Sequence, residues 1–196
     1  MKSDLLTALA IACAIGSFTC ASGRAADRPA AADDQQAAAT AHAIALADGK
    51  LELTTPKNWI RKEPRASIIE HEFEIPAAKG DSSGGRMTVM SAGGSVDANI
   101  DRWKGQFKDG DKAKNPSHVM KKQIAGAEVH LVDLSGTFKD QRGPFAPAVE
   151  RANYRMLAAI IAKDGGNYFI KFYGPEQTVS ENAEPFRRMI DGLKQK

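Results

Sequence analysis

The stretch from Ser95 to Phe107, SVDANIDRWKGQF, carries amide, guanidinium and carboxylate side chains on what the sequence predicts to be one helix. Asn99, Arg102 and Gln106 follow one another at spacings of three and four residues, which brings them to neighbouring positions on a helix surface. Such groups can recognise the polar surface of a protein partner, or they can hold the helix against a loop at the edge of a sheet. Both interpretations stay open, and the three residues are candidate partner-binding residues.

The apolar residues of the same stretch predict which side of the helix is buried. Their positions at i, i+4, i+7 and i+11 form one continuous stripe: Val96, Ile100, Trp103 and Phe107. We therefore expect Trp103 in the core and not on a ligand platform. Ser95 suits the N-cap, and Asp97 in the first turn interacts favourably with the helix dipole.

Three motifs near this helix are incomplete. The Gly-Gly-Ser segment before the helix could hold a phosphate, but Asp97 would repel an anion there and also replaces the last glycine of a hydrolase nucleophile elbow. The segment GDSSGGR lacks the Lys-Ser/Thr of a P-loop and precedes a strand. The segment DGDKAKNPSHVM starts like a calcium loop but has Ala113 and Met120 at ligand positions. We expect no enzyme activity and no cofactor.

His118 and His130 lie on adjacent predicted strands and are the histidines best placed to share a metal ion. A two-residue turn at residues 125–126 predicts a hairpin in which Asp133 faces His118 and Lys121 faces His130. In that register the two imidazoles point to opposite faces of the sheet, and no third ligand is visible. We therefore expect no metal site.

Residues 67–76, SIIEHEFEIP, alternate in polarity, which predicts a half-buried strand. One face carries Ile69, His71, Phe73 and Ile75. The other face carries Glu70, Glu72 and Glu74, and we expect these carboxylates to be solvated.

The predicted loop of residues 139–151, KDQRGPFAPAVER, is long for a compact domain, and loops of this length are often functional. An exposed Phe145 flanked by Arg142 and Arg151 would suit a protein partner, because aromatic residues and arginine are enriched at interface hot spots. Alternatively, Phe145 packs into a satellite core, and the prolines only prevent edge pairing. The three residues join the candidate partner-binding set.

A predicted sheet with two helices positions these candidates. We expect strands within residues 43–56 (two strands around Asp48-Gly49), 67–76, 86–92, 118–124, 127–138, 152–162 and 168–174, and helices over residues 96–108 and 182–193. The last two strands are apolar on both faces, which is typical of central strands covered on two sides. The expected fold class is α+β, a mostly antiparallel β-sheet covered by helices on both faces.

The first 25 residues are typical of a secretory signal peptide. Lys2 precedes an uncharged apolar core, and Gly23 and Ala25 place small residues before a cut after Ala25. An uncleaved N-terminal anchor is one alternative, because the apolar stretch is at the short limit of a membrane span. A lipoprotein cut before Cys20 fits less well, because Phe18 and Thr19 precede it. We expect export to the periplasm or the extracellular space.

The mature chain would contain no cysteine, because Cys13 and Cys20 both lie in the signal. It would therefore have neither disulfides nor thiolate-bound zinc. Its 25 basic and 23 acidic residues are near balance, which does not indicate a nucleic-acid partner. Residues 26–43 are Ala-rich and predict a flexible spacer. Residues 44–196 fit a single domain.

The order of these elements resembles the PsbP/Mog1-like fold, with a bend that carries Trp59 and a C-terminal helix. The segments ANIDRWKGQF, YRMLAAII and KFYGP, in this order, resemble a group of uncharacterised secreted bacterial proteins with an ANIDRWxGQF-type helix. The resemblance covers residues 51–193. It implies an α/β/α sandwich and an accessory or protein-binding role, and it implies no catalytic set.

We therefore expect a secreted, non-catalytic accessory or binding protein of the cell envelope that docks a protein partner. One alternative is a lipid or small-molecule binding protein, which an apolar pocket of roughly 300 Å³ or more between sheet and helix would favour. Another is a hydrolase with scattered residues, for which no nucleophile–base pair is visible. We expect contact with a membrane only through an uncleaved signal segment.

Overall fold

The computed structural model of the chain describes residues 40–108, 118–141, 147–163 and 166–196. All of them belong to the second of the two units into which the chain divides, Gln36–Lys196. The predicted signal peptide and most of the predicted spacer lie outside the described residues, as do Arg142 and Phe145 of the predicted loop.

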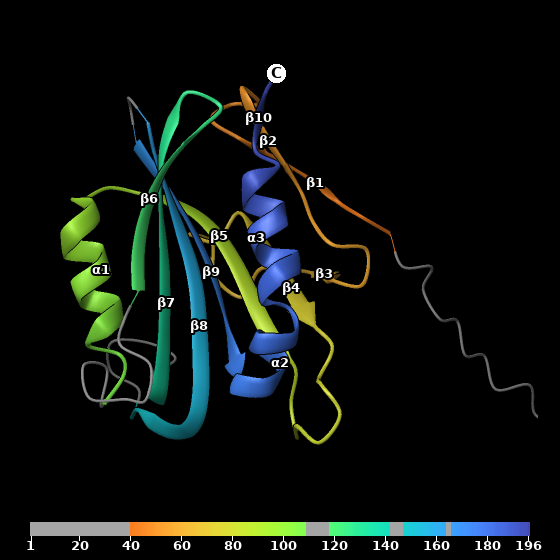
Figure 1. The fold of residues 1–196 in the computed structure, drawn as a ribbon, viewed down its shortest axis with the longest axis vertical. Helices are drawn as coiled ribbons and strands as arrows, with labels where there is room; N and C mark the ends of the chain where they lie inside the picture. Colours follow the sequence, from red (N-terminus) through yellow and green to blue (C-terminus); the bar gives the residue numbers. More distant parts are fainter. Residues whose placement is uncertain (1–39, 109–117, 142–146, 164–165) are drawn as a thin grey trace, which may run out of the picture. The chain divides into compact units, whose positions relative to one another are not determined.

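An antiparallel sheet forms the centre of this unit (Figure 1). In the described part of the chain it has seven strands in the order β3-β4-β5-β9-β8-β7-β6. In that order the strands are Ile60–Lys62, His71–Ile75, Gly85–Ala92, Gly166–Pro175, Val149–Lys163, Ala127–Asp140 and His118–Ile124. The two strands that the sequence predicts to be central, β8 and β9, both lie inside the sheet.

The hairpin of β6 and β7 has the predicted register. Its two turn residues both have positive φ, 49° at Ala125 and 71° at Gly126, as a two-residue hairpin turn requires. His118 pairs with Asp133 and Lys121 pairs with His130. The two histidines therefore lie on opposite faces of the sheet, because alternate residues of a strand point to opposite sides.

The helix α1 (Val96–Lys104) covers one face of the sheet (Figure 1). Ser95 caps it as predicted, because its Oγ accepts a hydrogen bond from the main-chain N of Ala98 at 3.2 Å. Trp103 is buried, also as predicted, and its ring meets Phe169 of β9 edge-on at 5.9 Å between centroids. The apolar stripe of α1 is thus the seam between the helix and the sheet.

The helix ends four residues before the predicted Lys108, because the chain there turns to pair with β7. The main-chain N of Lys108 donates to the carbonyl oxygen of Thr137 at 2.9 Å, and that of Lys139 donates to the carbonyl oxygen of Gln106 at 2.7 Å. This short extension places the side chain of Gln106 over the sheet.

Two helices and a small sheet cover the opposite face. The helices are α2 (Glu176–Glu181) and α3 (Ala183–Asp191), and the small antiparallel sheet has the order β1-β2-β10 (Ala43–Leu46, Leu51–Thr54 and Lys194–Gln195). Between these elements and the main sheet lies the larger hydrophobic cluster, which includes Ile44, Trp59, Phe172, Phe186 and Ile190. The predicted fold class is confirmed, with helices on both faces of a mostly antiparallel sheet.

Three short elements differ from the prediction. The segment around Trp59 continues into the edge strand β3 where only a bend was expected, α2 precedes the expected C-terminal helix, and β10 pairs with β2 to form a separate sheet. None of them exceeds six residues. Such lengths are too short to produce a recognisable periodic pattern.

Candidate docking surfaces

The three candidate residues on α1 have different surroundings. Asn99 is 4% exposed; its Nδ2 donates to the carbonyl oxygen of Ser95 at 2.9 Å, and its Oδ1 accepts from Nη2 of Arg102 at 2.5 Å. Arg102 is otherwise exposed, whereas Gln106 is half-buried. Asn99 thus stabilises the first turn of α1 from within, and Arg102 is the residue of the three that faces solvent.

Gln106 contacts Lys171, a residue that the sequence analysis did not single out. The Nζ of Lys171, on β9, donates to Oε1 of Gln106 at 2.6 Å. The same ammonium group lies 5.5 Å from the ring centroid of Phe138 and 5.2 Å from that of Tyr173, within the range of cation–π interactions. A single charged residue inside the aromatic strand segment YFIKFYG was the signal that could have drawn attention to it.

The surroundings of Lys171 disfavour the protonated, positively charged form of its amine. Burial, with smaller contributions from the positive charges of Arg102 and Arg86, lowers the pKa of Lys171 from 10.5 to about 8. The carboxylate of Asp140 acts in the opposite direction. Among the described residues no carboxylate forms an ion pair with Lys171. We call Arg102, Gln106 and Lys171 the α1 flank.

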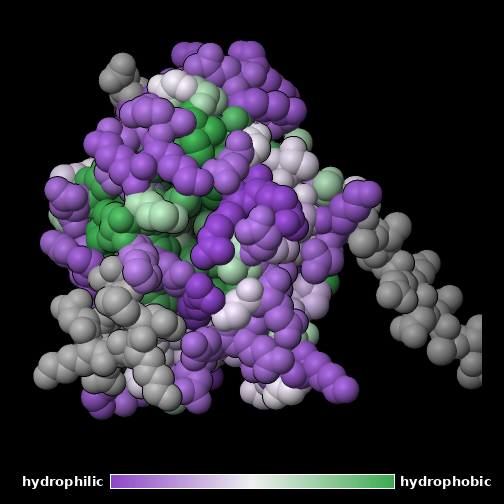
Figure 2. Space-filling view, viewed as in Figure 1, coloured by the Kyte–Doolittle hydropathy of each residue, from purple (hydrophilic) through white to green (hydrophobic). Residues whose placement is uncertain are grey.

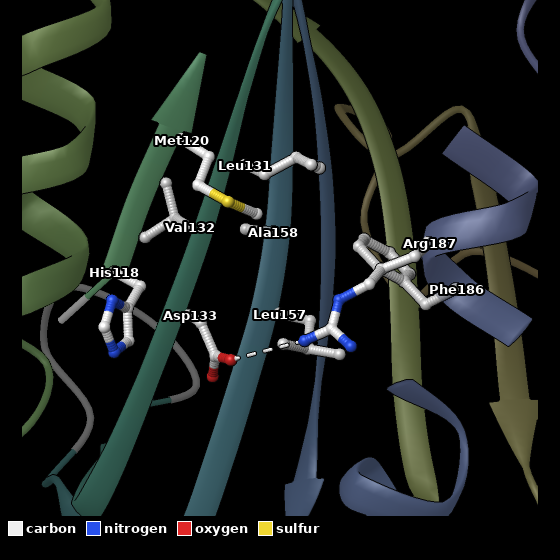
Figure 3. Close-up of a pocket in the computed structure, with 9 residues that line it drawn as sticks. All are labelled: His118, Met120, Leu131, Val132, Asp133, Leu157, Ala158, Phe186 and Arg187. Carbon is white, nitrogen blue, oxygen red and sulfur yellow. Dashed lines mark ion pairs between the residues drawn. The ribbon is translucent and has the colours of Figure 1, made fainter. Parts of the chain in front are cut away.

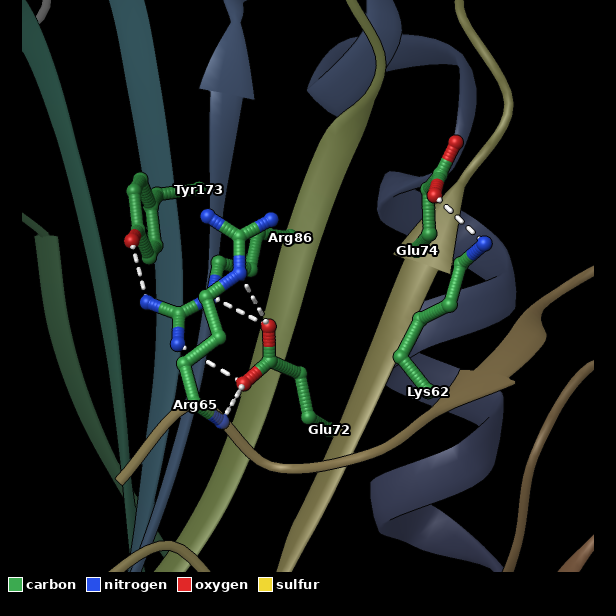
Figure 4. A network of polar contacts seen from close by, with 6 residues as sticks. All are labelled: Lys62, Arg65, Glu72, Glu74, Arg86 and Tyr173. Atoms are coloured by element: carbon green, nitrogen blue, oxygen red, sulfur yellow. Dashed lines mark hydrogen bonds and ion pairs between the residues drawn. The ribbon is translucent and has the colours of Figure 1, made fainter.

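A polar network lies beside this flank on strands β4, β5 and β9 (Figure 4). Glu72 accepts from Nε and Nη2 of Arg86, both at 2.8 Å, and from the main-chain N of Arg65 at 3.1 Å. Nη1 of Arg86 also donates to Oη of Tyr173 at 2.8 Å. The side-chain hydrogen bond from Arg86 is the largest cause that holds the pKa of Glu72 below its usual range.

The network corrects one expectation about the acidic strand face. Glu72 is only 2% exposed, although the sequence predicts a solvated residue, whereas Glu70 and Glu74 are exposed as expected. The reason is Arg86 on the neighbouring strand, which supplies the charge and the two donors that a buried carboxylate requires. The charged and polar groups of this network form hydrogen bonds with one another. We therefore infer that the network stabilises the fold and does not bind a partner.

The predicted loop of residues 139–151 is shorter than expected, because β7 extends to Asp140 and β8 begins at Val149, which places Arg151 on a strand. Arg151 pairs with Asp140, with 3.1 Å between Nε and Oδ2. Its guanidinium therefore already has a carboxylate partner within the hairpin of β7 and β8. Arg142 and Phe145 lie outside the described residues, so the hypothesis of a docking loop stays a prediction.

The strand β6 forms an end of the main sheet and pairs only with β7 in the described part of the chain. Val119 is 44% exposed and Met120 is 49% exposed, on opposite faces of the strand. Lys121 and Lys122 follow, and each is paired with a carboxylate of this chain: Lys121 with Glu128 at 2.6 Å and Lys122 with Asp191 at 3.0 Å. Val119 and Met120 therefore make the first part of this edge apolar. The positive charges of the two lysines that follow are neutralised by carboxylates of the same chain.

A groove of about 150 Å³ lies beside this edge, between β6 and α3 (Figure 3). Its lining residues come from β6, β7, β8 and α3: His118, Met120, Leu131, Val132, Asp133, Leu157, Ala158, Phe186 and Arg187. We call it the β6–α3 groove. Figure 2 shows hydrophobic surface in this region of the molecule, between polar surfaces on either side.

The polar end of the β6–α3 groove contains one carboxylate and two guanidinium groups. Asp133 accepts from Nε and Nη2 of Arg155 at 2.9 and 2.7 Å, a bidentate arrangement. Arg187, on α3, approaches the same carboxylate only to 3.9 Å, and its side chain is 42% exposed. Arg155 thus neutralises the negative charge of Asp133. The more distant Arg187 then leaves this end of the groove with one excess positive charge.

A second depression, of about 470 Å³, is lined mostly by charged and polar side chains near β3: Arg61, Lys62, Glu63, Pro64, Glu70 and His71. Nη2 of Arg61 lies 2.6 Å from Nδ1 of His71. Burial, and to a lesser degree the charge of Arg61, lowers the pKa of His71. The mixed charges of this depression do not form the apolar pocket that a lipid carrier would require.

The β6–α3 groove was not predictable from the sequence, because its walls come from four separate segments. The signal in the sequence was the segment HVMKK, in which two adjacent apolar residues make both faces of an edge strand apolar. No group of three or more His, Cys, Asp or Glu side chains that could hold a metal ion occurs in the described residues. Over the same residues, every helix is too short or too polar to cross a membrane.

Comparison with solved structures shows similarity to cyanobacterial PsbP from Synechocystis, with a TM-score of 0.50, 10% identity and coverage of 86% of this chain and 100% of that chain. The chain also resembles the Ran-binding protein Mog1p of Saccharomyces cerevisiae (TM-score 0.46, 9% identity, 79% and 95% coverage). A third match is a protein of unknown function from Pseudomonas aeruginosa (TM-score 0.42, 12% identity, 80% and 97% coverage). No family model and no curated protein matches the sequence.

The likeness to cyanobacterial PsbP confirms the predicted PsbP/Mog1-like fold. At this level of identity it establishes the fold alone. The resemblance of the helix segment ANIDRWKGQF to uncharacterised secreted bacterial proteins stays a prediction.

Proposed function

We propose that this chain is an exported, non-catalytic accessory protein of the cell envelope that binds a protein partner through the β6 edge and the β6–α3 groove. The observation that carries the proposal is the β6 end of the main sheet, which has no further strand among the described residues: Met120 lines an apolar groove there, and Val119 is exposed on the other face of β6. Exposed apolar surface that adjoins a groove marks interaction sites on soluble proteins. The predicted signal peptide supports export to the periplasm or the extracellular space.

The size of the groove favours a protein partner over a small-molecule ligand. Pockets that enclose lipids or drug-sized ligands measure roughly 300–1,000 Å³, whereas the β6–α3 groove measures about 150 Å³. A cavity of this size suits one large side chain, the way in which interface hot spots fill pockets on a partner. The lipid-carrier alternative therefore receives no support from this groove.

Photo-crosslinking from two exposed apolar positions tests the proposal. A benzoylphenylalanine replaces Val119 in one strain and Ile68, which is 60% exposed and follows β3 at the opposite end of the sheet, in a second strain. Irradiation of intact cells of the native host, with mass spectrometry of the adducts, should give a specific polypeptide adduct from position 119 and none of the same mass from position 68.

Two further variants locate the contact. Met120→Lys should abolish the adduct from position 119, whereas the double variant Arg102→Ala and Gln106→Ala should retain it. Loss of the adduct with the double variant alone would place the partner on the α1 flank instead. Absence of any adduct from position 119 in folded protein would refute the proposed docking surface.

A further inference from the structure

We propose that the partner binds as an extended segment along β6 that places one large apolar side chain in the β6–α3 groove and a carboxylate beside Arg187, two residues away in its sequence. This inference rests on the proposed function and adds the chemistry of the partner. It follows from three properties of the described residues: the main-chain groups of β6 that point away from β7, the volume of the groove and the excess charge of Arg187.

Among the described residues, the main chain of β6 has no partner strand on the side away from β7. Ile124 and Ala127 flank the two-residue turn, so in a hairpin of this type they hydrogen-bond to each other. Hydrogen-bonding direction alternates along an antiparallel strand, which turns the N–H and C=O groups of Val119, Lys121 and Gln123 away from β7. An extended segment can pair with these groups, as in other cases of strand addition.

A strand added to β6 would lie about 4.8 Å from it. Met120 and His118 are themselves lining residues of the groove, so a large side chain of the added strand reaches the groove past them. Beyond them the floor consists of Leu131 and Leu157, and Phe186 of α3 closes the far side (Figure 3). The groove volume of about 150 Å³ accepts one such side chain.

Charge specifies a second position of the partner. Asp133 is satisfied by the bidentate contact with Arg155, and the nearest Nη of Arg187 stays 3.9 Å from it. The charge of Glu176 also acts on Arg155, but among the described residues Glu176 forms no ion pair with either arginine. The guanidinium of Arg187 is therefore the less closely paired positive charge at the groove, and its complement is a carboxylate.

The spacing follows from strand geometry. Side chains that point to the same face of a strand are two residues apart. The groove and Arg187 both lie on the face that α3 covers, so the apolar residue and the acidic residue of the partner must occupy positions i and i+2 or i and i−2. The two lysines of β6 add no charge requirement, because Glu128 and Asp191 already neutralise them.

Selection from a phage-displayed library of random decapeptides tests this chemistry. The library is selected in parallel on the domain from residue 26 onward and on three variants: Met120→Lys, Arg187→Gln and Arg188→Gln. Arg188 is the matched control, because it lies next to Arg187 on α3 but pairs with Glu184 at 3.3 Å. Circular dichroism and thermal unfolding establish that each variant is folded.

The wild type and Arg188→Gln should enrich peptides that have Leu, Met, Phe or Trp two residues from Asp or Glu. Arg187→Gln should keep the apolar preference, lose the acidic one and bind the selected peptides roughly tenfold more weakly, as expected for a lost charge-assisted contact. Met120→Lys should bind none of them. No enrichment, or equal acidic preference on Arg187→Gln and the wild type, would overturn the inference.

The two proposals fail in different ways. If position 119 crosslinks a partner but the library yields no such pattern, the docking surface stands and the partner chemistry is wrong. If position 119 crosslinks nothing and the library also yields no peptide, the proposed function itself fails.

Discussion

At the scale of single residues, the buried carboxylate of Glu72 is the group on which the polar network depends. Glu72→Gln removes the negative charge that faces Arg86, which is itself largely shielded from solvent. Breaking a buried ion pair from one side leaves an uncompensated charge, so we expect the free energy of unfolding at pH 7 to fall by about 2–4 kcal/mol. Urea denaturation followed by circular dichroism measures this loss.

Glu74→Gln is the matched control for this prediction. Glu74 belongs to the same strand and pairs with Lys62 at 3.0 Å, but both side chains are about half exposed. Its replacement should cost less than about 1 kcal/mol, because exposed ion pairs contribute little. Equal losses for the two variants would show that Glu72 does not act as a buried ion-pair partner.

The carboxylate of Glu72 also predicts how the free energy of unfolding changes at acidic pH. Because Arg86 lowers the pKa of Glu72 in the folded state, the stabilisation is fully present above the ordinary value of 4.5 and is lost as the pH falls through the folded-state pKa. The stability difference between the wild type and Glu72→Gln should therefore shrink below pH 4.5. A difference that stays constant down to pH 3 would contradict the assignment.

Lys171 predicts a second rise of stability with pH, this time in the alkaline range. Its pKa is about 8 in the folded state against 10.5 ordinarily, so the unfolded chain holds the proton more strongly over that interval. The free energy of unfolding should therefore rise as the pH increases from about 8 to 10.5. Allowing for partial solvent screening of this half-buried group, the rise should amount to about 1–3 kcal/mol.

Lys171→Met should remove this rise, since no titrating amine remains at the position. Urea denaturation between pH 7 and 11 compares the wild type with this variant and with Lys57→Met, which changes an exposed lysine. The Lys57 variant should keep the wild-type slope. An unchanged slope in Lys171→Met would mean that the amine titrates as it does in water.

At the scale of elements, two glycines set the distance between β5 and β9. A Cβ added to Gly174 would lie 2.8 Å from the Cα of Gly85, closer than real contacts allow. Gly174→Ala must push the two strands apart, and overpacking of this kind costs about 1–3 kcal/mol. Thermal unfolding should show a lower Tm for this variant.

Gly93→Ala is the control for the glycine prediction. An added Cβ there meets no atom within 4 Å, so its Tm should stay near that of the wild type. A normal Tm in both variants would mean that the sheet adjusts to the added methyl group without cost.

Elements whose contacts are set locally were predictable from the sequence. The stripe through Trp103 determined how α1 packs, and the turn at residues 125–126 determined the register of β6 and β7 because a two-residue loop leaves no freedom. The central position of β8 and β9 followed from their apolar character on both faces.

Contacts between segments far apart in the sequence were not predictable. The hydrogen bond between Gln106 and Lys171 spans 65 residues, and the β6–α3 groove is assembled from four segments. Glu72 and Arg86 are closer, but residues 76–84 connect their strands and do not determine the register. These features depend on tertiary packing, which single-sequence periodicity does not encode.

At the scale of the whole unit, the layers cover the main sheet unevenly. The helix α1 packs on one face against residues of β7, β8 and β9, while α2, α3 and the small sheet cover the other face. Neither cover extends over the apolar residues of β6, Val119 and Met120. The open end is therefore a property of the layer arrangement and not of a single loop.

The proposed mature chain should be insensitive to reductant. Cleavage after Ala25 removes Cys13 and Cys20, so no disulfide contributes to its stability. Intact mass spectrometry of the protein from the periplasm or medium should give Ala26 as the first residue, and the urea midpoint should be the same with and without dithiothreitol. A midpoint that falls with reductant, or a mass that includes residues 1–25, would contradict the prediction of a cleaved signal.

The small sheet has a consequence for when the protein can fold. The strand β2 lies between β1 and β10, which are the first and the last strands in the described residues. The cluster that begins at Ile44 is completed only by Phe186, Ile190 and Leu193. This layer can therefore close only after residues 44–193 have all been synthesised, and long-range closure of this kind slows folding. The delay would suit a polypeptide that has to be threaded through a membrane while it is still unfolded.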